Sequence, residues 1–266
     1  MYIISAVIEK EQARVALLDK HEYKLLLKKE GTLDALATLC SDVISEGGIK
    51  AADVDYIGVA ADFSIAPKLE AKTGIKCIGA TLTDARALGE AYEQSDANTL
   101  VMLKIDDTVE CGIVIDKKLY TGANGQSGNV AHMVINYNGF ECSCGNRGCF
   151  EAYASNSGFK RIVSEAGVGV ATHKELFAMS TPESKLAQKN YVNYLATGIT
   201  NIINLFQPRH LVFEGPFTEV GDALMEPLMD IILREQYTHS MPNKCDVRFA
   251  STEEDTALIG AALLGR

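Results

Sequence analysis

The chain has 266 residues, of which 47% are hydrophobic and 23% charged, which is ordinary for a globular protein with a sizeable core. The formal net charge is -10 and no basic run offsets it, so we expect no direct binding to nucleic acid. No apolar run is long enough for a membrane span, the start lacks the features of a signal peptide, and the seven cysteines are an odd number, so we expect a cytoplasmic protein.

The first hundred residues predict alternating strands and helices. Apolar runs at 2–8 and 13–18, joined by a short charged segment, predict a β-hairpin. Apolar residues at helical spacing from Thr32 onward predict a helix that stops near Gly47, a common helix terminator. The pattern then predicts strands at 54–60 and 75–79 and helices at 65–73 and 83–95.

The remainder of the chain begins a second series after a polar link at 96–98. Thr181 and Pro182 predict the cap and first turn of a long helix that ends before Pro208. The other predicted elements are strands at 99–105, 110–116, 210–213 and 245–249, a glycine-rich loop at 122–128, and helices at 221–234 and 256–264. We therefore expect an α/β architecture built twice, with a smaller lobe at 1–97 plus 255–266 and a larger lobe at 98–254.

Three cysteines lie close together in the larger lobe, at Cys142, Cys144 and Cys149. Thiolates are strong zinc ligands, and structural zinc takes four cysteine or histidine ligands in a tetrahedron. Intervening glycines allow the backbone to curl so that the sulfurs can meet. His132 lies ten residues upstream and is the nearest candidate for the fourth ligand. A reduced cluster without metal and a disulfide are the alternatives.

The same region resembles the signature of the ROK family, which contains sugar kinases and sugar-responsive transcriptional repressors. Weaker likeness extends along the chain, for example at 87–90, 115–120 and 258–262. The segments that carry the strongest resemblance are Gly122–Gly125 through His132, and Cys142–Glu151. The resemblance implies a two-lobed actin/hexokinase-like (ribonuclease H-like) α/β fold with a zinc loop of three cysteines and one histidine, and commonly a homodimer.

The phosphate-binding turns of the family kinases do not match this sequence. The family's first strand carries an Asp and a Gly-Gly-Thr turn, which here correspond to Val7 and to Glu9–Glu11. The second turn, Gly-Thr-Gly in the family, corresponds to 106–108, of which Asp106 and Asp107 are acidic. Phosphate needs backbone N–H groups or cations nearby, and carboxylates repel it, so the turns argue against binding of ATP and Mg²⁺.

The catalytic base of the family kinases is also missing. In the family, an Asp in an Asn-Asp-Ala-Asn segment takes the proton from the sugar hydroxyl, and this Asp corresponds to Leu82. Leucine cannot accept a proton, and loss of a general base typically costs about two to four powers of ten in rate. Asp84 could serve only if the register shifted by two residues.

The sugar-binding segments are reduced as well. Compared with the family, the sequence lacks a loop of about twenty residues between 58–63 and 65–67, and a family Glu corresponds to Asn129. His132 and Glu151 are the family sugar contacts that remain, and Glu151 could equally orient the cysteine loop. The adenosine-side turn, with consecutive glycines in the family, is Glu214-Gly215-Pro216 here.

These residues favour a ROK-family protein without kinase activity that acts as a scaffold, sensor or regulatory protein in carbohydrate metabolism, with a possible sugar ligand. One alternative is an active ATP-dependent kinase of hexoses or N-acetylhexosamines. The other is a sugar-responsive transcriptional regulator without its own helix-turn-helix, since the first strand begins at Tyr2 and leaves no room for one.

Overall fold

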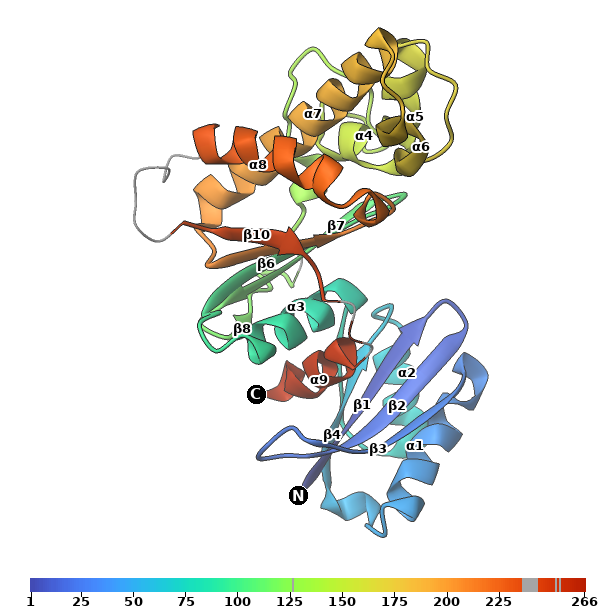
Figure 1. The fold of residues 1–266 in the computed structure, drawn as a ribbon. Helices are drawn as coiled ribbons and strands as arrows, with labels where there is room; N and C mark the ends of the chain where they lie inside the picture. The colour runs from blue at the N-terminus through green and yellow to red at the C-terminus, as the bar shows by residue number, and fades with distance from the viewer. Residues whose placement is uncertain (126, 236–243, 252, 254) are drawn as a thin grey trace. The chain divides into compact units, whose positions relative to one another are not determined.

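The computed structural model describes residues 1–125, 127–235, 244–251, 253 and 255–266, and the chain in it divides into two compact units. The first unit comprises Met1–Leu100, Gly112–Tyr120 and Ser251–Arg266, and the second comprises Val101–Cys111 and Thr121–Ala250. Each of the two sheets has helices packed near it, which confirms the predicted α/β class (Figure 1).

The sheet of the first unit has five strands in the order β3–β2–β1–β4–β5. Strands β1 to β3 form an antiparallel meander, whereas β4 and β5 run parallel to β1. Its elements are β1 (Tyr2–Glu9), β2 (Gln12–Asp19), β3 (Leu25–Thr32), α1 (Leu36–Glu46), β4 (Val54–Ala60), α2 (Ile65–Thr73), β5 (Cys77–Ala80), α3 (Leu82–Glu93) and α9 (Thr256–Ala262).

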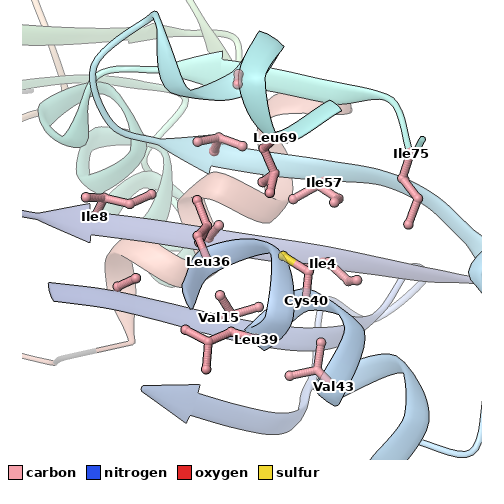
Figure 2. Close-up of a cluster of buried hydrophobic side chains, with 14 of the residues drawn as sticks. Ile4, Ile8, Val15, Leu36, Leu39, Cys40, Val43, Ile57, Leu69 and Ile75 are labelled. Atoms are coloured by element: carbon pink, nitrogen blue, oxygen red, sulfur yellow. The ribbon is translucent and has the colours of Figure 1, made fainter. Parts of the chain in front are cut away.

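Hydrophobic cores cover both faces of this sheet because alternate residues of β1 point to opposite sides. Ile4 and Ile8 belong to the cluster under α1 and α2, which Figure 2 shows in close-up. Ile3 and Val7 belong to a second cluster, which includes alanines of α3 and α9. The almost continuous apolar run at the start of the sequence therefore reflects a strand that is buried on both faces.

Glycines let the helix α9 approach the rest of the first unit very closely. A Cβ atom on Gly260 would lie 1.7 Å from the backbone oxygen of Ala85, and one on Gly89 would lie 2.0 Å from that of Thr256. Side chains at these two positions would overlap the facing backbone. The glycines therefore fix how α3, which begins at Leu82, packs on α9.

The second sheet repeats the pattern of the first in the order β10–β9–β6–β7–β8. Strands β7 and β8 are antiparallel, and β9 and β10 are parallel. The elements of this half are β6 (Thr99–Ile105), β7 (Val109–Ile115), β8 (Lys118–Leu119), α4 (Glu151–Ala154), α5 (Asn156–Glu165), α6 (His173–Ala178), α7 (Pro182–Phe206), β9 (His210–Glu214), α8 (Asp222–Glu235) and β10 (Asp246–Phe249).

Most predicted elements lie where the pattern placed them, but the helices α4, α5 and α6 and the strands β8 and β3 were not predicted. The longer of the two missed strands is β3. Its three consecutive leucines are followed by Lys28, Lys29 and Glu30, so it lacks the alternation of a strand that covers a core. None of its residues is fully buried, because it is the outer strand of its sheet. The predicted glycine-rich loop at 122–128 includes Gln126, which lies outside the described residues. Along the described part of the chain, no helix has both the length and the apolar character needed to cross a membrane.

We predict that Gly260→Val destabilises the first unit by about 3 kcal/mol or more, because the new side chain must displace backbone atoms. Urea denaturation followed by circular dichroism measures the change. Gly169→Ala is the control, since a Cβ atom there meets nothing within 4 Å, and its effect should stay within about 0.5 kcal/mol. Equal stabilities of the two variants would contradict the packing argument.

Candidate functional site

The predicted metal ligands come together in one loop of the second unit. The ligand atoms of His132, Cys142, Cys144 and Cys149 all lie within 4.8 Å of one another. The Sγ atom of Cys142 is 3.6 Å from Nδ1 of His132, and the Sγ atoms of Cys144 and Cys149 are 3.7 Å apart. Zinc–sulfur bonds of about 2.3 Å in a tetrahedron place sulfurs about 3.8 Å apart, so the four residues fit a zinc ion.

Local backbone geometry explains how three sulfurs can converge. Gly145 and Gly148 have φ values of 90° and 75°, which favour glycine. A Cβ atom on Gly148 would lie 1.7 Å from the backbone oxygen of Asn136. Around Gly145, the Cys142 amide donates to the Asn146 oxygen at 2.9 Å and closes a tight turn. The glycines of the motif are therefore required by the fold of the loop.

Burial differs among the four candidate ligands. Cys149 is fully buried, and this burial raises the pKa of its thiol to about 12. Cys144 is exposed, and the backbone N–H of Asn146 lowers the pKa of its thiol. A metal ion that bound here would have to displace the proton of the buried thiol, so its binding would release protons.

An aromatic stack, which the sequence analysis did not identify, fastens the cysteine loop to the helices of the second unit. Phe140 stacks on Tyr153 with 4.5 Å between the ring centroids, and Tyr153 lies 4.1 Å from Tyr194 of α7. The Phe140 amide donates to the Tyr153 hydroxyl at 2.9 Å, and Arg161 covers the other face of Phe140 at 3.7 Å. Such cation–π and stacking contacts stabilise the loop independently of a metal.

Glu151 connects the cysteine loop to the second sheet. Its Oε2 atom accepts the amide of Val109, at the start of β7, at 3.0 Å, and its Oε1 atom accepts the hydroxyl of Ser143 at 3.4 Å. Ser143 lies between two of the candidate ligands. Both carboxylate oxygens thus have partners within the protein, and the geometry supports the loop-orienting alternative for this residue.

In the first unit, the position of the family's aspartate is apolar and closed. Val7 is 1% exposed in β1, and Arg14 lies directly opposite it on β2. Glu9, at the end of β1, accepts Nη2 of Arg14 at 3.3 Å and Nη2 of Arg86 at 3.4 Å. Arg86 follows Leu82 by one turn of α3, so the two share a helix face. An ion pair therefore joins the end of β1 to α3.

Asp84, the carboxylate that a register shift would bring to the base position, caps α3. It is the third residue of α3, and its amide donates to the Thr81 hydroxyl at 3.0 Å while its carboxylate accepts the Thr81 amide at 3.4 Å. This reciprocal capping box holds the carboxylate at the start of the helix.

The second turn, 106–108, closes as an acidic hairpin in the second unit. Asp106 lies 3.2 Å from Lys104, and Lys104 also lies 3.2 Å from Glu110. The Asp107 carboxylate accepts the side-chain amide of Asn156 at 3.0 Å. Lys104 is thus shared by two carboxylates of the protein, which leaves less of its charge for a bound phosphate.

The structure also describes the link between β4 and α2 and the turn at 214–216. Strand β4 ends at Ala60 and α2 begins at Ile65, and Asp62 caps the link by accepting the Ser64 amide at 2.9 Å. In the second unit, Gly215 packs so tightly that a Cβ atom would lie 2.3 Å from the Ile105 oxygen. Asn129, at the family's Glu position, precedes the short 3-10 helix Val130–His132 that carries His132.

A cavity of about 500 Å³ lies beside the adenosine-side turn, and Pro216 and His173 are among its lining residues. His173 is 3% exposed and stacks on Phe159 with 3.8 Å between the ring centroids. Its Nε2 atom has no hydrogen-bond partner among the described residues. Burial lowers the pKa of His173 to about 4, so it is neutral near pH 7. Sequence reasoning did not find this residue, because a single histidine carries no pattern.

Comparisons with known proteins agree with the resemblance seen in the sequence. The family model described as "ROK family" matches residues 25–266. A glucokinase of Halalkalibacterium halodurans is 28% identical over 226 residues, which cover 76% of this chain and 67% of that protein. The xylose repressor of Bacillus subtilis is 29% identical over 181 residues, which cover 66% of this chain but only 47% of the repressor. The crystal structure of a ROK hexokinase from Thermus thermophilus matches 99% of this chain and 97% of that chain with a TM-score of 0.84 at 21% identity, and thereby confirms the fold.

We predict that His173→Phe flattens part of the acid dependence of stability. The folded-state pKa of His173, about 4, lies below its usual value of about 6.5, so the unfolded chain binds more protons between these values. The contribution of neutral His173 to the free energy of unfolding should therefore be fully present above pH 6.5 and be lost as the pH falls toward 4. Over this range the free energy of unfolding should fall by up to about 1.4 kcal/mol per pH unit more in wild type than in the variant. Urea denaturation at a series of pH values tests this, and parallel profiles for the two proteins would refute it.

Proposed function

The chain belongs to the ROK family, and we propose that it is a sugar-kinase-like member without kinase activity that serves as a scaffold, sensor or regulatory protein in carbohydrate metabolism. The observation that carries this proposal is the Glu9–Arg86 ion pair, which lies at 3.4 Å. It joins the residue in place of the first phosphate-binding glycine to the helix that should carry the base. The family likeness supplies the sugar-kinase origin, and the changed residues support the loss of activity.

The electrostatics of both turns oppose phosphoryl transfer. A nucleotide triphosphate carries several negative charges, and catalysis of its transfer depends on cations and N–H groups aimed at those charges. Glu9 contributes a carboxylate to the first turn, and Asp106 and Asp107 contribute two to the second. The nearby Arg14, Arg86 and Lys104 each pair with at least one of the protein's own carboxylates.

Proton abstraction from a sugar hydroxyl lacks a suitable group. Leu82 begins α3 where the family has its aspartate, and Asp84 is held in a capping box. Restoring the base alone would leave the carboxylates of both turns in place. The base and both phosphate turns act in the same phosphoryl-transfer step, so restoring one of them alone should recover little of the rate.

We also propose that His132, Cys142, Cys144 and Cys149 hold one structural zinc ion, since their donor set and spacing suit tetrahedral zinc. A closed set of four protein ligands leaves no position for a reactive water, so such an ion would support the fold of the loop. A cytoplasmic location and a homodimer remain part of the proposal through family likeness. The relation to glucokinase and xylose repressor chains keeps an active kinase and a regulator without its own DNA-binding domain as the alternatives.

For the metal, we expect about one equivalent of zinc in the untagged, reduced protein by elemental analysis. Cys149→Ser should lose the metal and lower the melting temperature by several degrees, because metal binding contributes to folding free energy. Cys77→Ser is the control, since Cys77 is half-buried and lies outside the cluster, and it should retain the zinc. Less than about half an equivalent in wild type would count against the site.

For the activity, we expect no ADP release when the protein is offered ATP, Mg²⁺ and a panel of hexoses and N-acetylhexosamines. An active family kinase assayed in parallel serves as the positive control. Leu82→Asp alone should not restore turnover, because the phosphate turns remain acidic. Turnover of wild type near about one per second, a low but ordinary enzyme rate, would overturn the proposal in favour of the kinase alternative.

A further inference from the structure

Two cysteines of the loop in the second unit differ in exposure although their sulfur atoms are neighbours. The Sγ atoms of Cys144 and Cys149 are 3.7 Å apart, which is within van der Waals contact. Cys144 is exposed, whereas Cys149 is fully buried. An oxidant in the solvent can therefore reach one sulfur of the pair, and the second sulfur is already in contact with the first.

The backbone holds Cys149 in place but leaves room beside Cys144. Gly148 precedes Cys149, and a Cβ atom on it would lie 1.7 Å from the Asn136 oxygen, so this part of the loop is tightly packed. Gly145 follows Cys144, and a Cβ atom there would meet nothing within 4 Å. The sulfurs of a disulfide are about 2.05 Å apart, so one residue of the pair has to move. The open space beside Gly145 allows Cys144 to do so.

The third cysteine of the loop is less suited to a disulfide, although all the candidate ligand atoms lie within 4.8 Å of one another. The Sγ atom of Cys142 lies 3.6 Å from Nδ1 of His132 and 4.0 Å from the hydroxyl oxygen of Ser143. A single residue separates Cys142 from Cys144, so a bond between these two would close a small and strained ring. The contact between Cys144 and Cys149 spans more of the chain, and the geometry therefore favours this pair.

Contacts that involve none of the sulfurs also hold the loop to the second unit. Phe140 stacks on Tyr153, and Glu151 accepts hydrogen bonds from Val109 and Ser143. These contacts do not change when a thiol is oxidised. The loop can therefore keep its fold in the oxidised chain, and a reducing thiol can return it to the original state by exchange.

We propose that Cys144 and Cys149 form a reversible disulfide in the presence of hydrogen peroxide, and that the loop holds zinc only while both are reduced. The second part rests on the zinc site proposed above, whereas the disulfide requires only the two thiols. A disulfide removes two of the four candidate ligands, and the two that remain are too few for a structural zinc ion. For a chain that acts as a sensor, the loop supplies a site at which an oxidant changes the protein.

Hydrogen peroxide accepts two electrons from the pair of thiols in two steps. The sulfur of Cys144, as its thiolate, attacks one oxygen of the peroxide, the O–O bond breaks, and the released hydroxide takes up the thiol proton and leaves as water. The sulfur of Cys149 then attacks the sulfenic acid on Cys144, the S–O bond breaks, and the hydroxide leaves with the Cys149 proton as a second water. Two thiols and one peroxide thus give one disulfide and two waters.

The test uses the full chain, freed of metal with a chelator, kept reduced, and then treated with about one equivalent of hydrogen peroxide. We expect the intact mass to fall by about 2 Da, the mass of two hydrogens, and peptide mapping to place the bond between Cys144 and Cys149. The oxidised chain should take up less than about a tenth of the zinc that the reduced chain binds, and dithiothreitol should restore the uptake. Failure of the reduced chain to bind zinc would overturn the metal site alone, because the mapped disulfide does not depend on it.

Variants separate the roles of the two thiols. Cys149→Ser should stop at the sulfenic acid on Cys144, which dimedone traps as an adduct, because the second thiol is gone. Cys144→Ser should show no loss of mass at the same peroxide concentration, since Cys149 is buried. Cys77→Ser is the matched control, a half-buried cysteine outside the cluster, and should form the disulfide as wild type does.

Three results would overturn the proposal in wild type. Peroxide leaves all the thiols free, the mapped bond involves Cys142, or Cys144 passes to sulfinic acid without a disulfide. Mass and mapping are read on the wild-type chain, so the proposal stays testable even if a variant folds poorly. The assay involves neither ATP nor sugar, so its outcome is independent of the proposed lack of kinase activity.

Discussion

The packing of α3 against α9 determines where the decisive residues of the first unit lie. A Cβ atom on Gly89 or Gly260 would overlap facing backbone at 2.0 Å or less, so the two helices can meet only through glycine. This contact fixes the start of α3, and hence the positions of Leu82 and Arg86 beside the end of β1. The geometry of a sugar-kinase lobe is thus retained at the level of the backbone, while the side chains that face one another have changed.

Charge explains why these changes belong together. Once glycine at the first turn is replaced by Glu9, a nearby cation lowers the cost of placing a carboxylate there, and Arg86 provides it. The same exchange occurs at the second turn, where Lys104 lies beside Asp106 and Glu110. In both units a cation that could have contacted phosphate instead contacts a carboxylate of the protein. In each turn the acidic residue and a nearby cation therefore form an ion pair. A turn that had simply lost one phosphate-binding residue would not show such a pair.

Local spacing in the sequence was sufficient to predict the candidate metal ligands, the two α/β halves and most helices, because these depend on neighbours along the chain. The four ligands lie within eighteen residues, and the cap at Thr181 starts α7 as expected. Contacts between distant segments could not be predicted in this way. Glu9 meets Arg86 across 77 residues, and Glu151 meets Val109 across 42, and no periodic pattern records either pair. The edge strand β3 was missed because its residues are only partly buried or exposed, so its sequence does not alternate between apolar and polar residues as the prediction requires.

The cysteine loop also serves the structure of the second unit. The loop contacts the rest of the second unit at two places. Phe140 stacks on Tyr153, and Glu151 binds both Ser143 and the start of β7. Loss of one of its four convergent residues would therefore disturb a helix and a sheet as well as a ligand site. Selection for a folded second unit can therefore maintain the motif whether or not sugar is phosphorylated, because neighbouring residues of the loop serve the fold. The cysteine motif thus identifies the ancestry of the chain, whereas its activity has to be judged from the turns and from the residue at the base position.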